Sequence, residues 1–277
     1  MKTIMNNSKP IKEYQKRNSK NRKLFIFVSV IAALIIIGKG KKYITRRNAM
    51  LKMNNPIVIE FPLRGEWNAP ISPGDKIPSH GTNRLATRYA YDFIQVDWAR
   101  PGHPAYKGGF FNYLLNGNSL QDYYAYGQEI HSPFDGTVIV AEDGYTENKK
   151  TNLFWDIANA YKNAHFFDPD KDDIRSVTGN YIVIRYSDTV YAALCHLKTN
   201  SITVSAGQKV TKGELLGKVG HSGNSMAPHL HFQLMDSLDI RTANGIPAAF
   251  EKYEVFRSGK WEQVTKGIPK SKDRIRF

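Results

Sequence analysis

The stretch GHSGNSMAPHLHFQL, residues 220–234, decides the fold expected for this chain. Its first half is rich in Gly, Asn and Ser, as turns are, and its second half has the apolar alternation of a β-strand. In a strand, residues i and i+2 lie on one face, about 7 Å apart. His229 and His231 can therefore face one site, one as a metal ligand and the other free for catalysis. An H-x-H pair alone is a weak signal, because two such histidines can equally be surface groups or satisfied core groups.

Three further polar residues occur in comparable settings. His80 lies in the turn SPGDKIPSHGTN just before a predicted strand, Asp92 lies inside the apolar strand YAYDFI, and His196 ends the strand TVYAALCHL. An unpaired carboxylate among aromatic side chains is costly, so Asp92 needs a partner. A cation is one such partner, and an arginine is the alternative.

Together these elements resemble the M23 (LytM-type, lysostaphin-like) metallopeptidases. The similar motifs are SHG…YAYDF, then CHL, then GHSGNSMAPHLHF, and the spacer SITVSAGQKVTKGELLGKVG also fits the family. The resemblance covers roughly residues 60–250. It implies that His80, Asp92 and His231 bind zinc (Zn2+), and that His196 and His229 are catalytic histidines beside the metal.

The chemistry of these residue types agrees with that implied role. Two imidazoles and one carboxylate leave the fourth tetrahedral position of zinc open for water, as in catalytic sites. Bound zinc lowers the pKa of such a water to about 7 and polarises a carbonyl group. Two further histidines can orient the water, transfer its proton or stabilise an oxyanion. The sequence leaves open which of His196 and His229 is the general base.

The chain departs from the family pattern at two places. The gap between the first histidine and the aspartate is usually three residues, but here it is eleven, 81–91. We interpret the extra residues as a lengthened turn. The alternative ligand, Asn83, offers a neutral amide, which is a poor ligand for zinc. The second departure is Gln233, where the family often has Glu, and this amide can still hydrogen-bond a ligand.

The expected fold is mostly β, an antiparallel sheet core with an open groove and long loop insertions. Short β-type runs recur between turns rich in Gly, Asn, Asp and Ser. Two long insertions, 100–126 and 145–178, interrupt them and are expected to form the groove walls, with a short helix within 150–165. We expect a peptidase domain over 60–255 and a C-terminal tail over 256–277. The predicted strands are YAYDFIQVDW, GTVIVAED, NYIVIRYS, TVYAALCHL, ELLGKVG and HLHFQLMD.

The charge of the chain is concentrated at its N-terminus. The net charge is +14, but residues 1–47 hold 13 of the 39 Lys and Arg residues and a single acid, Glu13. The remaining residues are therefore nearly neutral, with no electrostatic footprint for nucleic acid. The sequence predicts a basic cytoplasmic arm over 1–23, a membrane anchor over 24–38 and a linker over 39–59.

The predicted anchor is LFIFVSVIAALIIIG, residues 24–38, which carries no charge. Fifteen residues are fewer than the ~20 usually needed to span a bilayer, so a cleaved signal peptide and a buried core helix are alternatives. We favour a single transmembrane helix, because no small-residue cleavage site follows and bases flank both ends. Eight bases precede the run and five follow it closely, which predicts a cell-membrane protein with its N-terminus inside and its catalytic domain extracytoplasmic.

Three classes of function fit the sequence. The resemblance implies a zinc endopeptidase acting on peptidoglycan peptides, and all five expected site positions are present. A non-catalytic module of the same fold, which binds cell-wall material or activates another hydrolase, is the alternative. A biotinyl- or lipoyl-type carrier is the third class, but VSAGQKVTKGELLGKVG lacks a Met-Lys-Met-like turn beside its nearest lysine, Lys212. The single cysteine, Cys195, excludes an intrachain disulfide and is expected to be a small buried hydrophobe.

Overall fold

The central strands bury both of their faces, which explains why their sequences are almost continuously apolar. The computed structural model describes residues 55–277 except 110–112 and 115. In β8 (Asn180–Ser187), Ile182 and Ile184 belong to one hydrophobic cluster, whereas Tyr181 and Val183 belong to a second. Successive side chains of a strand point to opposite faces, so each face of the sheet packs against a separate cluster.

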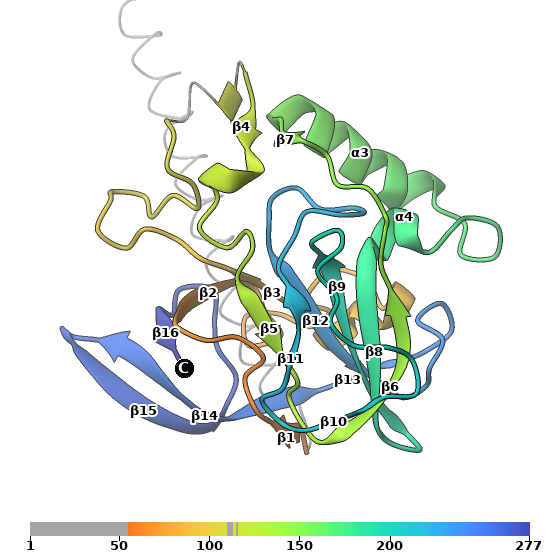
Figure 1. The fold of residues 1–277 in the computed structure, drawn as a ribbon. Helices are drawn as coiled ribbons and strands as arrows, with labels where there is room; N and C mark the ends of the chain where they lie inside the picture. Colours follow the sequence, from red (N-terminus) through yellow and green to blue (C-terminus); the bar gives the residue numbers. More distant parts are fainter. Residues whose placement is uncertain (1–54, 110–112, 115) are drawn as a thin grey trace, which may run out of the picture. The chain divides into compact units, whose positions relative to one another are not determined.

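Within the described residues, twelve strands form one sheet, and Figure 1 shows its central strands side by side. All of its strand pairs are antiparallel except that of β1 with β14. Two strands lie off the main path: β13 (Gly245–Ile246) pairs with β12, and β15 (Lys260–Gly267) pairs with β14. The main path runs through β1 (Ile57–Ile59), β14 (Ala248–Arg257), β16 (Ile275–Arg276), β2 (Glu66–Ile71), β3 (Tyr91–Ile94), β12 (Leu230–Met235), β9 (Val190–Leu197), β8, β6 (Gly136–Glu142) and β10 (Lys209–Val210).

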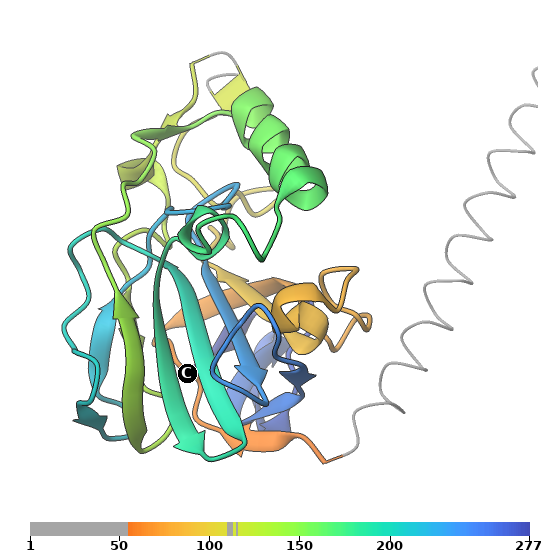
Figure 2. The same cartoon turned by 90° about the vertical axis from the view of Figure 1, so that its right-hand side faces the viewer.

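The two insertions contribute several of the remaining elements and are joined to each other. β4 (Asn118–Ser119) of the first insertion pairs with β7 (Lys150–Thr151) of the second. A further small sheet joins β5 (Glu129–His131) to β11 (Leu215–Lys218). Figures 1 and 2 both show α3 beyond the same end of the central strands as the β4–β7 pair. The helical elements are η1 (Arg84–Tyr89), η2 (Leu120–Asp122), α3 (Leu153–Phe166) and α4 (Arg175–Thr178).

The structure confirms the mostly β fold and the antiparallel core. Each of the six predicted runs contains a strand, and α3 provides the helix expected within 150–165. Residues 256–277, expected to be a tail, contain β15 and β16, and residues 57–59 of the expected linker form β1. These strands complete one edge of the sheet. The open groove remains a prediction.

The N-terminal predictions lie outside the described residues. These are the basic arm over 1–23, the anchor over 24–38 and most of the linker over 39–59. In the part of the chain that the structure describes, no helix has the length and apolar character needed to span a membrane.

Candidate metal centre

The centre is built on two neighbouring strands whose register brings an acid and a histidine face to face. β3 and β12 are antiparallel, and Asp92 is the direct cross-strand partner of His231. Directly opposed residues share one face, with Cβ atoms about 5 Å apart. Oδ1 of Asp92 consequently lies 2.9 Å from Nδ1 of His231.

His80 reaches the same carboxylate from the loop before β3. Its Nε2 lies 3.2 Å from both Oδ1 and Oδ2 of Asp92. The extra residues of the long gap fold into η1, and the backbone N–H of Ser79 donates to the carbonyl of Arg88, 3.0 Å away. This hydrogen bond closes the loop, so that His80 lies beside the start of β3. The alternative ligand, Asn83, is exposed and accepts a hydrogen bond from Arg88.

A β-bulge turns His196 into the site. Strict alternation along β9 would point Cys195 and His196 to opposite faces, and the structure departs from it here. Cys195 packs in the second hydrophobic cluster and is the cross-strand partner of His231, so it lies on the face of the site. His196 lies on that face too, because its ring centroid is 4.6 Å from that of His229. The pairing of β8 with β9 shifts register at this point, and His196 has a φ of 63°. Bulges commonly re-aim a side chain beside an active site, and a left-handed non-glycine residue marks strain there.

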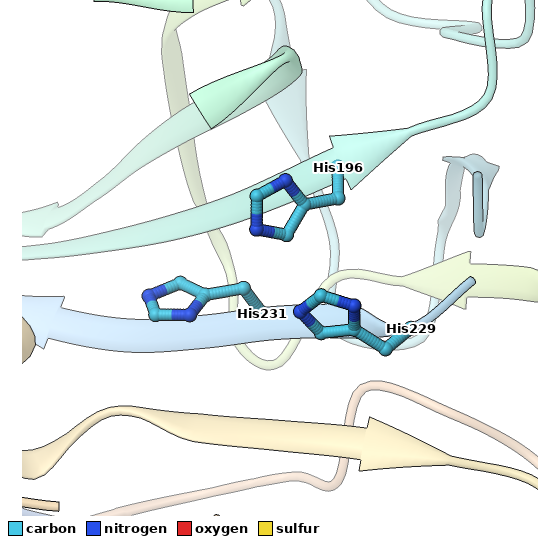
Figure 3. A group of neighbouring side chains, drawn as sticks. All are labelled: His196, His229 and His231. Atoms are coloured by element: carbon cyan, nitrogen blue, oxygen red, sulfur yellow. The ribbon is translucent and has the colours of Figure 1, made fainter. Parts of the chain in front are cut away.

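His229 precedes β12 and completes the cluster shown in Figure 3, in which the rings of His196, His229 and His231 face a common space. Its Nε2 lies 3.6 Å from Oδ1 of Asp92. The structure thus brings all five predicted site residues together. Two overlapping groups have ligand atoms within 4.8 Å of one another: His80, Asp92 and His231, and His196, His229 and His231.

Hydrogen bonds on the outer side of the rings determine which nitrogen faces the centre. Nε2 of His231 lies 3.0 Å from Oε1 of Gln233, whose own amide nitrogen donates to the carbonyl of Leu85. Since this oxygen can only accept, His231 carries its proton on Nε2 and turns the Nδ1 lone pair towards Asp92.

The same reasoning applies to His80. The hydroxyl of Ser79 donates its hydrogen to the carbonyl of Thr87 and therefore accepts from Nδ1 of His80, 3.1 Å away. The lone pair on Nε2 of His80 consequently faces Asp92 as well. Two imidazole lone pairs and a carboxylate at 2.9–3.2 Å repel one another unless a cation or a proton lies between them.

The two remaining histidines are held in the same way by backbone carbonyls. Nδ1 of His196 lies 2.9 Å from the oxygen of Ser222, and Nδ1 of His229 lies 2.7 Å from that of Ala227. Each ring therefore donates from Nδ1 and presents the lone pair of Nε2 to the centre. Both carbonyls belong to residues 220–228, the turn that the sequence singled out.

Burial and the neighbouring histidines keep His196 and His229 neutral. Burial lowers the pKa of His196 well below its ordinary value, and the neighbouring His229 and His231 lower it further. The pKa of His229 is also lowered, again chiefly by burial. Burial alone would raise the pKa of Asp92, but the surrounding histidines hold it well below its usual range. The centre thus combines an ionised carboxylate with the neutral imidazoles of His196 and His229.

The donor set fits a zinc ion. Two imidazole nitrogens and a carboxylate oxygen are ligands that zinc accepts, and three protein ligands are typical of catalytic zinc. Between 11% and 19% of the side-chain surface of His80, Asp92 and His231 is exposed, so the centre is in contact with solvent. A proton on His231 can take the place of a cation. Burial alone would lower the pKa of His231, but the hydrogen bond with Asp92 and its charge raise this pKa above its ordinary value.

Removing the oxygen that orients His231 should weaken metal binding. In Gln233→Leu, the Nε2–H of His231 loses its acceptor, and the ring is free to turn or to change tautomer. We expect zinc affinity to fall by about 10- to 100-fold, as is usual when such a supporting group is lost. Gln233→Glu, which retains an acceptor oxygen, should bind zinc at least as well as the wild type. Competition with a chelator measures both affinities, and equal affinity of the Leu variant and the wild type would exclude this role.

Several supporting residues were not identified as such from the sequence. Ser79, Ser222 and Ser225 hold histidines or the turn, and Glu147 accepts the backbone N–H of His221 at 2.6 Å. The serines of the turn were visible as part of the motif. Glu147 lies 73 residues before the turn in an insertion, and no local pattern marks it.

Gly179 packs against the carbonyl that holds His196. Its φ is 63° and its ψ is −148°, and an added Cβ would lie 2.6 Å from the oxygen of Ser222. We expect Gly179→Ala to lower the free energy of unfolding by about 2 kcal/mol or more, because strain and a backbone clash act together. Gly144→Ala is the matched control, since its φ is +84° but nothing lies within 4 Å of an added Cβ. Denaturant unfolding compares the two, and an equal loss in both variants would argue against the clash.

A sheet that presents histidines and a carboxylate around one point is an arrangement of the kind that metal-dependent hydrolases use. The model of the family described as Peptidase family M23 matches residues 169–244. The matched segment contains His196, His229 and His231, whereas His80 and Asp92 precede it. This finding confirms the predicted resemblance to the M23 metallopeptidases.

Curated relatives share short segments with this chain. The peptidoglycan DD-endopeptidase ShyA of Vibrio cholerae is 40% identical over 57 residues, which are 21% of this chain and 13% of that protein. The peptidoglycan DD-endopeptidase ShyC of the same organism is 32% identical over 66 residues, 24% of this chain and 15% of that protein. The aligned part of the chain thus spans about a seventh of the length of these relatives. With the family match, they support the predicted class, a metalloendopeptidase.

Solved structures similar to this chain include two peptidases. The catalytic domain of lysostaphin from Staphylococcus simulans is 21% identical, with a TM-score of 0.29, and the alignment covers 50% of this chain and 88% of that one. A zinc-containing peptidase from Vibrio cholerae is 18% identical, also with a TM-score of 0.29, and the alignment covers 70% of this chain and 38% of that one.

Proposed function

We propose that this chain is a zinc-dependent endopeptidase that hydrolyses peptide bonds in bacterial cell-wall peptidoglycan. One observation carries the proposal: the unprotonated nitrogens of His80 and His231 face the carboxylate of Asp92 at 2.9–3.2 Å. Such an arrangement of acceptors needs a cation or a proton between them, and two imidazoles with a carboxylate are a donor set that zinc accepts. The M23 match and the peptidoglycan endopeptidases among its relatives support the substrate class.

The chain's own residues supply the acid–base chemistry. His80, Asp92 and His231 would hold the zinc, which when bound lowers the pKa of a water molecule and polarises the scissile carbonyl. His196 and His229 turn the lone pairs of their Nε2 atoms to the same space, and either can take a proton and later donate it to the leaving amine. Their Nδ1–H groups remain bonded to Ser222 and Ala227, so each ring keeps its orientation when it becomes charged.

The alternative is a module of the same fold that binds cell-wall material or activates another hydrolase without catalysis. A module of that kind has no need of the ligands and the basic histidines, yet this chain retains all five. We also propose that residues 24–38 anchor the domain at the extracytoplasmic face of the cell membrane. The lack of charge in that segment and the bases on both sides support this placement.

Hydrolysis of purified peptidoglycan tests the proposal. The full-length chain should release new amino groups, lose this activity with a zinc chelator and regain it when zinc is restored. Release of new reducing sugars without new amino groups would point to glycosidic cleavage. Binding of peptidoglycan with stoichiometric zinc but no hydrolysis would favour the non-catalytic module.

A further inference from the structure

The histidine of the turn has a side chain that the proposed chemistry does not use. His221 is 1% exposed, and burial lowers its pKa to about 4, so it is neutral. Within the described residues, its Nε2 is buried and has no hydrogen-bond partner. The ring makes its polar contact through Nδ1, which lies 3.0 Å from the hydroxyl of Ser225. A buried polar atom without a partner lowers stability, so the hydrogen bond at Nδ1 is what compensates for the burial of this ring.

Ser225 links this ring to a catalytic histidine. Its hydroxyl oxygen lies 2.7 Å from the carbonyl oxygen of Ala227 and 3.2 Å from Nδ1 of His229. The single hydroxyl hydrogen is donated to Ala227, so the oxygen can only accept from the two rings. His221 and His229 therefore both donate from Nδ1 into the same hydroxyl oxygen.

The alternative hydrogen-bond pattern is unfavourable. If Ser225 donated to His221 instead, His221 would carry its proton on Nε2, and that N–H would be buried without an acceptor. An orphaned buried donor costs about 1–3 kcal/mol by the usual measure. The donation by His221 thus fixes the direction of the Ser225 hydroxyl.

We propose that His221 is a positioning residue for His229, acting through Ser225. The inference rests on the proposed function, because it assigns His229 a role in catalysis. By fixing the hydroxyl towards Ala227, His221 keeps a second acceptor at Nδ1 of His229 beside the carbonyl at 2.7 Å. Two acceptors on one N–H restrict the tilt of the ring and hold its Nε2 towards the centre. The hydrogen bond of the His221 ring goes to Ser225, so His221 acts on His229 through that hydroxyl.

Kinetics of full-length variants provide the first test. In His221→Leu the donor is lost, and kcat should fall about tenfold while KM and zinc content stay unchanged. This fall is smaller than the 10²–10⁴-fold loss expected when a general base is removed. His221→Asn, whose amide nitrogen can occupy the position of Nδ1, should recover most of this loss. In a Ser225→Ala background, His221→Leu should cause no further fall in kcat, because the link is already broken. Equal falls in the presence and absence of Ser225 would overturn the proposal.

A control variant separates positioning from packing. His131 is another largely buried histidine whose Nδ1 meets a carbonyl, that of Gly213, on β5 and away from the centre. His131→Leu should lower thermal stability without lowering kcat. If His221→Leu does not fold, His221→Phe, which keeps a ring but no donor, replaces it.

A spectroscopic measurement is independent of peptidase activity. In the zinc-saturated, full-length chain with ¹⁵N-labelled histidine, the Nδ1–H of His229 should exchange slowly with water. Exchange should accelerate in His221→Leu and remain slow in His221→Asn. Unchanged exchange in a folded His221→Leu variant would overturn the positioning role. The exchange result stands even if the chain hydrolyses no peptidoglycan, so failure of this proposal and failure of the proposed function are distinguishable.

Discussion

The Asp92→Ala variant is expected to lose stoichiometric zinc and to hydrolyse peptidoglycan peptides about a thousandfold more slowly or worse, since a metal contributes several kcal/mol to transition-state stabilisation. Asp92 carries the negative charge of the proposed ligand set and meets both His80 and His231. Its loss leaves two neutral imidazoles, which cannot balance the charge of a divalent cation. Zinc content and the rate of amino-group release, measured on the same preparation, give both results.

The control for this variant is Asn83→Ala. Asn83 lies three residues after His80 and is the alternative ligand, but its side chain is exposed and bonded to Arg88. Full zinc content and activity are expected when it is removed. Zinc loss in Asn83→Ala together with retention in Asp92→Ala would reverse the assignment. Asp92→Asn tests the charge alone, because the amide keeps the shape of the carboxylate.

Replacement of either carbonyl-bound histidine should separate metal binding from turnover. His196→Ala and His229→Ala should retain zinc, because His80, Asp92 and His231 remain. Each variant should lose about 10²- to 10⁴-fold in kcat, the usual contribution of a general acid or base. The physical reason is the loss of an Nε2 lone pair held towards the centre by a hydrogen-bonded Nδ1–H.

The comparison of the two variants also assigns their roles. Each is examined for zinc content, for kcat and for the pH dependence of kcat, and the general base is the histidine whose loss removes the acidic limb. A variant with full activity would exclude that residue from the mechanism. A variant without zinc would move that residue into the ligand set, and the geometry allows this, since His196 and His229 form a second possible group with His231.

Most of the fold near the centre could be predicted from the sequence because it follows local alternation. The H-x-H strand and its neighbours appear as short apolar runs between turns, and the structure has strands there. The edge formed by β14, β15 and β16 was missed. Its residues include long charged side chains between the apolar ones, as in the run FEKYEVFR, which conceals the alternation.

The orientation of individual site residues was less predictable. His196 reaches the centre only because a bulge and a φ of 63° reverse the alternation of β9. The closure of the long gap before Asp92 depends on contacts of Ser79 with Thr87 and Arg88 that no motif encodes. The sequence likewise predicts that Gln233 hydrogen-bonds a metal ligand, which the structure shows to be His231. The second hydrogen bond of Gln233, from its amide nitrogen to the carbonyl of Leu85, could not be predicted from the sequence.

The zinc content of the full-length protein tests the central claim most directly. Elemental analysis after exhaustive dialysis should find about one zinc per chain in the wild type, as expected for a single three-ligand site, and almost none in His231→Ala. The claim rests on lone pairs of His80 and His231 that converge on Asp92. A wild-type protein that neither retains nor takes up zinc, or a His231→Ala variant that binds it as tightly, would contradict the account.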